Sequence, residues 1–151
     1  MTDTHTITIK PLTAADYNAW HGLWQDYLTF YQTSLPANIT QATWDKILDN
    51  QVPIFGFGAW NGEAMVGITH VVLHPNTWND SDCCYLEDLY VNNSVRGQGF
   101  GRALIDYVYN FAREKGCNRV YWSTQSDNAT ARTLYDNIAT LTDMVQYRKD
   151  L

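Results

Sequence analysis

The feature that most restricts the fold is an apolar, strand-like run that ends in a glycine-rich turn and continues into an amphipathic helix. The run spans Cys83–Val91, the turn covers residues 92–99, and the apolar residues that follow recur at helical spacing. Gly97, Gly99 and Gly101 remove side chains from the turn, so its backbone N–H groups can closely approach a ligand. Because these N–H groups also begin a helix, the segment predicts an anion site, and phosphate is the usual guest.

Two arginines, Arg96 and Arg102, flank this turn and add positive charge. The glycine spacing differs from the Gly-x-Gly-x-x-Gly of dinucleotide-binding folds, and the sequence contains no nucleotide P-loop. A hairpin precedes the segment instead of the opening strand of a βαβ unit. On the residues alone, a plain tight turn before a helix remains the alternative interpretation.

The chain predicts one α/β (α+β) domain, over residues 1–151, built around a mainly antiparallel sheet. Asn61-Gly62 between two strand-like runs is a strong hairpin signal. Strands are expected at residues 6–10, 54–60, 63–74, 83–91, 119–124 and 144–148. Helices are expected at residues 17–31, 40–50, 101–115 and 128–138.

The first helix carries an aromatic stripe at helical spacing. We interpret the stripe as core packing; the alternative is that some of its rings line a substrate pocket. Its members are Tyr17, Trp20, Trp24, Tyr27, Leu28 and Tyr31.

The charge balance disfavours nucleic acid as a partner. Ten Lys and Arg against sixteen Asp and Glu give a formal net charge of −6, whereas nonspecific nucleic-acid binding needs a basic face. A net-acidic surface suits a cationic small substrate better. The apolar runs are strand-sized, so we expect no membrane partner, and Met1–His5 shows no signal-peptide pattern. Three cysteines form no disulfide framework, so a cytoplasmic location is expected.

Three segments together carry a resemblance to a known family. Arg96-Gly-Gln-Gly-Phe-Gly101 resembles the Gln/Arg-x-x-Gly-x-Gly/Ala signature of the GNAT superfamily of N-acetyltransferases. Leu86-Glu-Asp-Leu-Tyr-Val91 is similar to the strand before that signature, and Asn128-Ala-Thr-Ala-Arg-Thr-Leu-Tyr135 to a later helix. The Leu-Glu-Asp sequence is shared with the diamine and polyamine acetyltransferase branch. Two positions depart from the pattern: Asn93 stands where Pro is common, and Asp136-Asn-Ile-Ala139 replaces the usual Gly-Phe.

This resemblance implies a twisted, mixed sheet in which two parallel strands splay apart and hold acetyl-CoA as cosubstrate. The pantetheine arm would pair with the strand at Leu89, and the pyrophosphate would lie on the N–H groups of the glycine turn. The residues expected to contact the cofactor are Leu89, Tyr90, Val91, Arg96, Gly97, Gln98, Gly99, Phe100, Gly101, Arg102 and Asn128.

The same resemblance suggests two catalytic residues. Tyr135 is the candidate acid for the leaving thiolate, since a phenol holds its proton at neutral pH; the alternative is a core tyrosine. Glu87 is the candidate base, acting through water, and the alternative is a salt-bridged carboxylate. Strand alternation predicts that Glu87 shares a face with Leu89 and that Asp88 points to the opposite face, as a structural or substrate-facing residue. A backbone N–H near Leu89 is expected to polarise the thioester carbonyl.

The function implied is direct transfer of an acetyl group from acetyl-CoA to a primary amine, with a diamine, polyamine or other small cationic amine preferred. Alternatives are a protein or peptide amine as acceptor, a CoA-binding sensor without catalysis, and a purely structural domain. A homodimer is expected from the resemblance alone. No metal is expected, since His70 and His74 lie in a strand, and Cys83 and Cys84 are interpreted as buried packing residues instead of acyl carriers.

Overall fold

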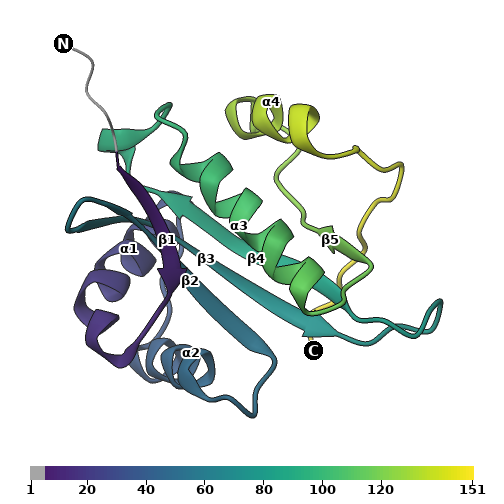
Figure 1. The fold of residues 1–151 in the computed structure, drawn as a ribbon, viewed down its shortest axis with the longest axis horizontal. Helices are drawn as coiled ribbons and strands as arrows, with labels where there is room; N and C mark the ends of the chain where they lie inside the picture. The colour runs from purple at the N-terminus through teal and green to yellow at the C-terminus, as the bar shows by residue number, and fades with distance from the viewer. Residues whose placement is uncertain (1–5) are drawn as a thin grey trace.

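The computed structural model describes residues 6–151; Met1–His5, where the sequence suggests no signal peptide, lie outside the described residues. The described strands form one sheet in the order β1-β2-β3-β4-β5 (Figure 1). The first three pairings are antiparallel and the β4–β5 pairing is parallel, which confirms the mixed, mainly antiparallel sheet. The strands are β1 (Ile7–Pro11), β2 (Ile54–Asn61), β3 (Ala64–His74), β4 (Cys83–Val91) and β5 (Arg119–Tyr121).

Helices cover both faces of this sheet. In Figure 1, α1 and α2 lie on one face, and α3 and α4 lie on the other. Two short 3-10 helices, η1 (Ala14–Asp16) and η2 (Asn93–Val95), precede α1 and α3. The helix bounds are α1 (Tyr17–Phe30), α2 (Ala37–Leu48), α3 (Phe100–Glu114) and α4 (Ala129–Ile138).

The aromatic stripe of α1 builds the core on its own face of the sheet. Trp20, Trp24 and Leu28 are buried and pack with Trp44 of α2, which supports the core interpretation for these residues. Burying such side chains contributes roughly 1.5–3 kcal/mol each. Tyr27 is only half-buried, and its hydroxyl takes part in a polar contact described below.

The opposite core lies beneath α3, whose apolar positions follow the helical period. Five residues of this helix are buried against β2, β3 and β4, so the start of α3 is held rigidly beside the end of β4. These residues are Phe100, Leu104, Ile105, Val108 and Ala112. The glycine turn is therefore fixed between two well-packed elements.

Two expected boundaries differ from the structure by three residues. The strand expected at residues 119–124 ends at Tyr121, because its pairing with β4 stops at Tyr85↔Tyr121 and residues 122–124 have no paired strand among the described residues. The second helix begins at Ala37, directly after Pro36, whose preset backbone suits a helix start.

The strand expected at residues 144–148 is wrong. This segment has no regular secondary structure, and Met144, Val145 and Tyr147 are 83%, 78% and 93% exposed. A strand needs both a hydrogen-bonding neighbour and a surface on which to bury its apolar face, and this segment has neither within the described residues. Alternation of apolar residues alone is therefore an insufficient signal here.

Candidate active site

The central feature of the site is the gap between β4 and β5. The two strands pair only over Cys83↔Arg119, Cys84↔Val120 and Tyr85↔Tyr121. Past Tyr85, β4 continues to Val91 with no strand on its β5 side among the described residues. The splayed strand pair expected from the sequence is confirmed. It leaves a length of β4 backbone, including Leu89, able to form hydrogen bonds with an extended ligand.

The glycine turn borders the same gap. Gly97 and Gly99 have φ angles of +79° and +90°, a left-handed conformation that side-chain-bearing residues rarely adopt. A Cβ on Gly97 would meet no atom within 4 Å, so the turn is open on that side. The N–H groups of Gly101 and Arg102 fall in the first turn of α3, where a helix offers no internal acceptors. This arrangement fits a diphosphate group.

The two arginines of the turn make different contacts. The Nε of Arg96 donates to the Val91 carbonyl at 3.2 Å, and its guanidinium lies over the rings of Phe30 and Tyr90, so Arg96 ties the turn to the end of β4. The exposed Arg102 pairs with Asp106 at 3.8 Å.

Two further expected cofactor contacts lie in the same turn. The Phe100 side chain is 1% exposed, so only its backbone can face a ligand. The buried Oε1 atom of Gln98 has no hydrogen-bond partner among the described residues. Contact of these residues with the cofactor stays a prediction.

The helix α4 positions Asn128 and Tyr135 beyond the gap. The Asn128 side chain accepts a hydrogen bond from the Ala131 N–H at 3.3 Å, so Asn128 is the N-cap of α4, while its contact with the cofactor stays a prediction. The Tyr135 ring contacts Trp122 edge-on at 5.3 Å between centroids. Burial, and to a smaller extent Tyr31, raises the pKa of Tyr135, so the phenol keeps its proton at neutral pH. A cavity of about 1400 Å³ reaches Tyr135 and Trp122 but is not lined by the glycine turn.

The expected orientation of Glu87 is wrong, and a β-bulge is the reason. His70 pairs with Asp88 and Val71 pairs with Leu86, so Glu87 has no partner on β3 and the strand alternation is interrupted. Its electrostatic neighbours include Asp88 and His70, which lie on the α1 side of the sheet and not on the side of Leu89. The two adjacent carboxylates therefore share a face.

The Glu87 side chain is exposed to solvent. Neighbouring residues nevertheless partly desolvate its carboxylate. Desolvation, followed by the charge of Asp88, raises its pKa, whereas positive charge such as that of Lys46 acts in the opposite direction. A carboxylate with a raised pKa is a better proton acceptor, which suits the predicted base. No direct salt bridge to Glu87 occurs among the described residues.

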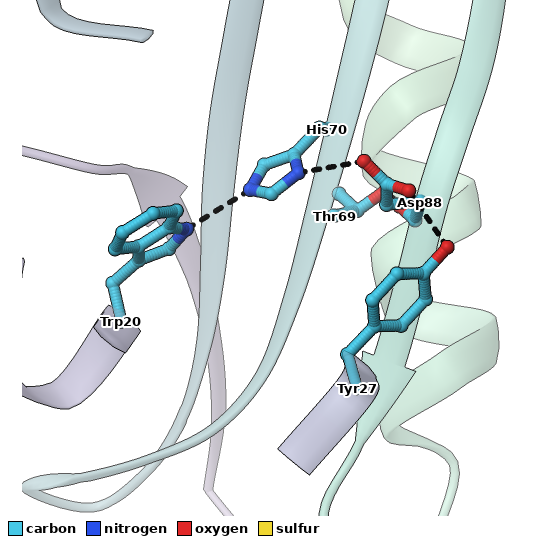
Figure 2. A network of polar contacts seen from close by, with 5 residues as sticks. All are labelled: Trp20, Tyr27, Thr69, His70 and Asp88. Carbon is cyan, nitrogen blue, oxygen red and sulfur yellow. Dashed lines mark hydrogen bonds and ion pairs between the residues drawn. The ribbon is translucent and has the colours of Figure 1, made fainter. Parts of the chain in front are cut away.

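A network of hydrogen bonds on the α1 side of the sheet is not predicted by the sequence patterns (Figure 2). The indole N–H of Trp20 donates to His70 Nε2 at 2.9 Å, and His70 Nδ1 lies 2.9 Å from Asp88 Oδ2. The other carboxylate oxygen of Asp88 accepts from the Tyr27 hydroxyl at 2.7 Å, and Thr69 Oγ1 donates to the Asp88 carbonyl at 2.8 Å. Spacing along α1 places Trp20 and Tyr27 on one face, but only the strand register brings His70 beside Asp88.

The adjacent cysteines on β4 are buried packing residues. Cys83 and Cys84 are fully buried, and burial raises the pKa of Cys84 to about 12, so a reactive thiolate does not form there at neutral pH. Within residues 6–151 no cluster of three metal-binding side chains occurs, and no helix there has the length and apolar content needed to cross a bilayer.

Comparison with known proteins agrees with this geometry. The sequence matches the Acetyltransferase (GNAT) family over residues 17–138. The D-amino-acid N-acetyltransferase HPA3 of Saccharomyces cerevisiae is 34% identical over 146 residues, which cover 95% of this chain and 91% of that relative. The thialysine N-epsilon-acetyltransferase of Caenorhabditis elegans is 31% identical over 93 residues, 62% of this chain and 57% of that relative.

The fold is also shared with solved structures. The aminoglycoside N-acetyltransferase AAC(6')-Iy, in complex with a bisubstrate analogue, has a TM-score of 0.84 and is 19% identical, with 97% of this chain and 99% of that chain covered. At that identity the likeness concerns the fold alone. The family match over residues 17–138 and the yeast relative show that this chain is a member of the GNAT acetyltransferase family.

Proposed function

We propose that this chain transfers the acetyl group of acetyl-CoA directly to the primary amine of a small, positively charged molecule. The observation that carries the proposal is the gap between β4 and β5 beside an open glycine turn, because it offers strand backbone and helix N–H groups to one extended ligand. Acetyl-CoA, when bound, supplies an activated thioester.

Different groups of the chain have different proposed roles in binding the cofactor and in transferring protons. The N–H groups at residues 97–102 would hold the diphosphate, and the N–H of Leu89 would polarise the thioester carbonyl. An alkyl ammonium titrates near about 10 and must lose a proton before it attacks. Glu87, through water, is the proposed acceptor of that proton, and Tyr135 is the proposed donor to the departing sulfur.

The acidic character of the α1 face supports a cationic acceptor. Glu87 and Asp88 lie together on this face, and Lys46 is the cation whose charge reaches Glu87. A hollow of about 330 Å³ opens on the same side of the sheet. Asp26 belongs to its lining, together with Thr29, Phe30, Tyr90, Asn92 and Asn93. Negative charge at a partly desolvated site favours an ammonium group.

The names of the relatives support an amine acceptor without selecting one. The yeast relative is named for D-amino acids and the nematode relative for thialysine. A diamine, a polyamine or a basic amino acid fits the carboxylates best, since each carries a second cation that can stay charged while the reacting amine is neutral.

The test is a thiol-release assay with acetyl-CoA and a panel of acceptors: a diamine, a polyamine, thialysine, D-amino acids, an aminoglycoside and a peptide with a free N-terminus. We expect turnover on the small dicationic amines and at least tenfold lower kcat/KM on the peptide. Tight CoA binding with no turnover on any acceptor would identify a binding domain and overturn the proposal.

We also propose that the chain forms a homodimer through its C-terminal segment. Leu141, Met144, Val145 and Tyr147 are all more than 70% exposed, and the outer edge of β5 carries no strand among the described residues. A second copy of this segment is suited to that edge, because unpaired strand edges readily accept another strand. Light scattering should give twice the chain mass, and Val145→Asp with Tyr147→Asp should give a monomer.

A reducing, cytoplasmic location is proposed from the cysteines. Cys83, Cys84 and Cys117 are free, as is usual where thiols are kept reduced. Fluorescence from a fusion at either end of the chain should be diffuse in the cytoplasm, and concentration in an oxidising compartment would contradict this location.

A further inference from the structure

The buried His70 is held in one tautomer by its neighbours. An indole N–H is a donor only, so the contact with Trp20 requires His70 Nε2 to be the acceptor. The ring proton of neutral His70 therefore sits on Nδ1, which donates to Asp88 Oδ2 at 2.9 Å. Trp20 is fully buried and His70 is 2% exposed, so water does not compete for either contact.

Asp88 is consequently anchored at three points. His70 Nδ1 and the Tyr27 hydroxyl each donate to one carboxylate oxygen, and the Thr69 hydroxyl donates to the backbone carbonyl (Figure 2). The donors come from α1 and β3, two elements already fixed by core packing. Hydrogen bonds to a charged group are about twice as strong as neutral ones, so the anchor is stiff.

The anchor lies at the bulge that sets the candidate catalytic groups. His70 pairs with Asp88 in the strand register, and the unpaired Glu87 is the residue just before it. Leu89, whose N–H is the proposed oxyanion donor, is the residue just after. A change in the Asp88 backbone would therefore displace both groups, and a misplacement of about 1 Å can lower a rate by roughly 10²-fold.

We infer that His70 is a positioning residue for the reaction: with its proton kept on Nδ1 by Trp20, it fixes Asp88 and thereby aims Glu87 and the Leu89 N–H at the reacting atoms. This inference rests on the proposed function. His70 does not relay protons, because both ring nitrogens are engaged and a second proton on Nε2 would break the contact with Trp20.

Two substitutions of His70 separate this role from packing. In His70→Asn the amide nitrogen can replace Nδ1 and still donate to Asp88, whereas in His70→Gln the polar end replaces Nε2 and the donor is lost. We expect His70→Asn to keep kcat within about threefold and His70→Gln to lower kcat by about 10- to 100-fold. The KM for acetyl-CoA should be unchanged in both variants.

A second pair of variants covers the case in which His70 variants fail to fold. Thr69→Ser retains the hydroxyl that holds the Asp88 carbonyl, and Thr69→Val removes it. Only Thr69→Val should lower kcat. Equal losses in both members of each pair, in proportion to a fall in Tm, would assign the network to stability alone and overturn the inference.

A measurement independent of turnover keeps this inference distinct from the proposed function. Long-range ¹⁵N–¹H correlation spectra should show His70 with its proton on Nδ1, and Trp20→Phe should weaken that preference. A proton on Nε2 in the unmodified protein would overturn the inference whatever the activity. If the tautomer is as expected but no amine is acetylated, the proposed function fails and the positioning role fails with it.

Discussion

Tyr85 and Tyr121 stack at the point where β4 and β5 stop pairing, with 5.0 Å between ring centroids and 25° between ring planes. The Tyr121 hydroxyl also lies 2.7 Å from His74 Nε2 of β3. The paired end of the gap is therefore closed by side chains from three adjacent strands. The open end, at Val91, meets the glycine turn. This difference between the two ends gives the gap a direction, and under the proposed function the diphosphate would lie at the open end, with the reacting thioester farther along β4.

Replacing Gly97 by Ala should weaken CoA binding by about tenfold, or about 1.4 kcal/mol. The added methyl group would lie on the open side of the turn, where nothing in the structure stands within 4 Å. Gly62→Ala is the matched control, since Gly62 also has a positive φ angle, +61°, and an open Cβ position, but lies in the β2–β3 hairpin. Both variants should lose about 1–2 kcal/mol of unfolding free energy.

Calorimetry measures the CoA affinity of both variants, and thermal melts measure their stability. Equal CoA affinity in Gly97→Ala and Gly62→Ala would mean that the turn does not hold the diphosphate.

The variant Tyr135→Phe should lower kcat by about 10²-fold without changing the affinity for CoA, because it removes the proton but keeps the ring against Trp122. The raised pKa of Tyr135 places loss of its proton above the ordinary tyrosine range, so the basic limb of the kcat profile should extend well past neutral pH. Tyr107→Phe, on α3, serves as control. An unchanged kcat would return Tyr135 to a packing role.

Glu87→Gln should lower kcat while raising stability at neutral pH. The pKa of Glu87 is raised in the folded protein by desolvation and by Asp88, so its charged form is disfavoured by folding. The neutral amide removes that penalty above the folded pKa, and the advantage should vanish below about 4.5, where both states bind the proton.

Thermal melts from pH 4 to 8 and the acidic limb of kcat measure the two effects, and Glu63→Gln in the exposed hairpin is the control. A variant that loses stability at pH 7 would show that Glu87 makes a favourable contact instead.

Cys84→Ala should retain acyl transfer within about twofold, because a thiol with a pKa of about 12 is not a nucleophile near pH 7. The loss of a buried side chain should cost about 1 kcal/mol of unfolding free energy. Cys117→Ala, at a half-buried position, provides the comparison. Mass spectrometry of the enzyme mixed with acetyl-CoA should find no acetylated Cys84; a stable adduct that later reacts with amine would contradict direct transfer.

Local sequence is sufficient to predict several features of the site. The glycine turn, the N-cap at Asn128 and the buried face of α3 all follow from contacts within a few residues, so sequence patterns alone indicate them. The splayed strands are expected from the family resemblance and agree with the early end of β5.

Glu87 and His70 show what local sequence leaves open. Strand alternation predicts opposite faces for Glu87 and Asp88, but the bulge depends on how β3 aligns with β4, which is a contact between distant residues. The Trp20–His70–Asp88 chain has the same origin, since its members come from three elements. Whether residues 144–148 form a strand likewise depends on which edges and surfaces of the sheet remain free, and local sequence does not contain that information.

The sequence by itself determined the glycine turn, the family and the chemistry to expect, because a backbone that opens a helix with glycines needs no distant partner to present its N–H groups. Tertiary structure alone decided which way Glu87 points and which donors hold Asp88. The physical reason is that strand register and helix docking are set by the packing of the whole core, and a shift of one residue moves a side chain to the other face of a sheet.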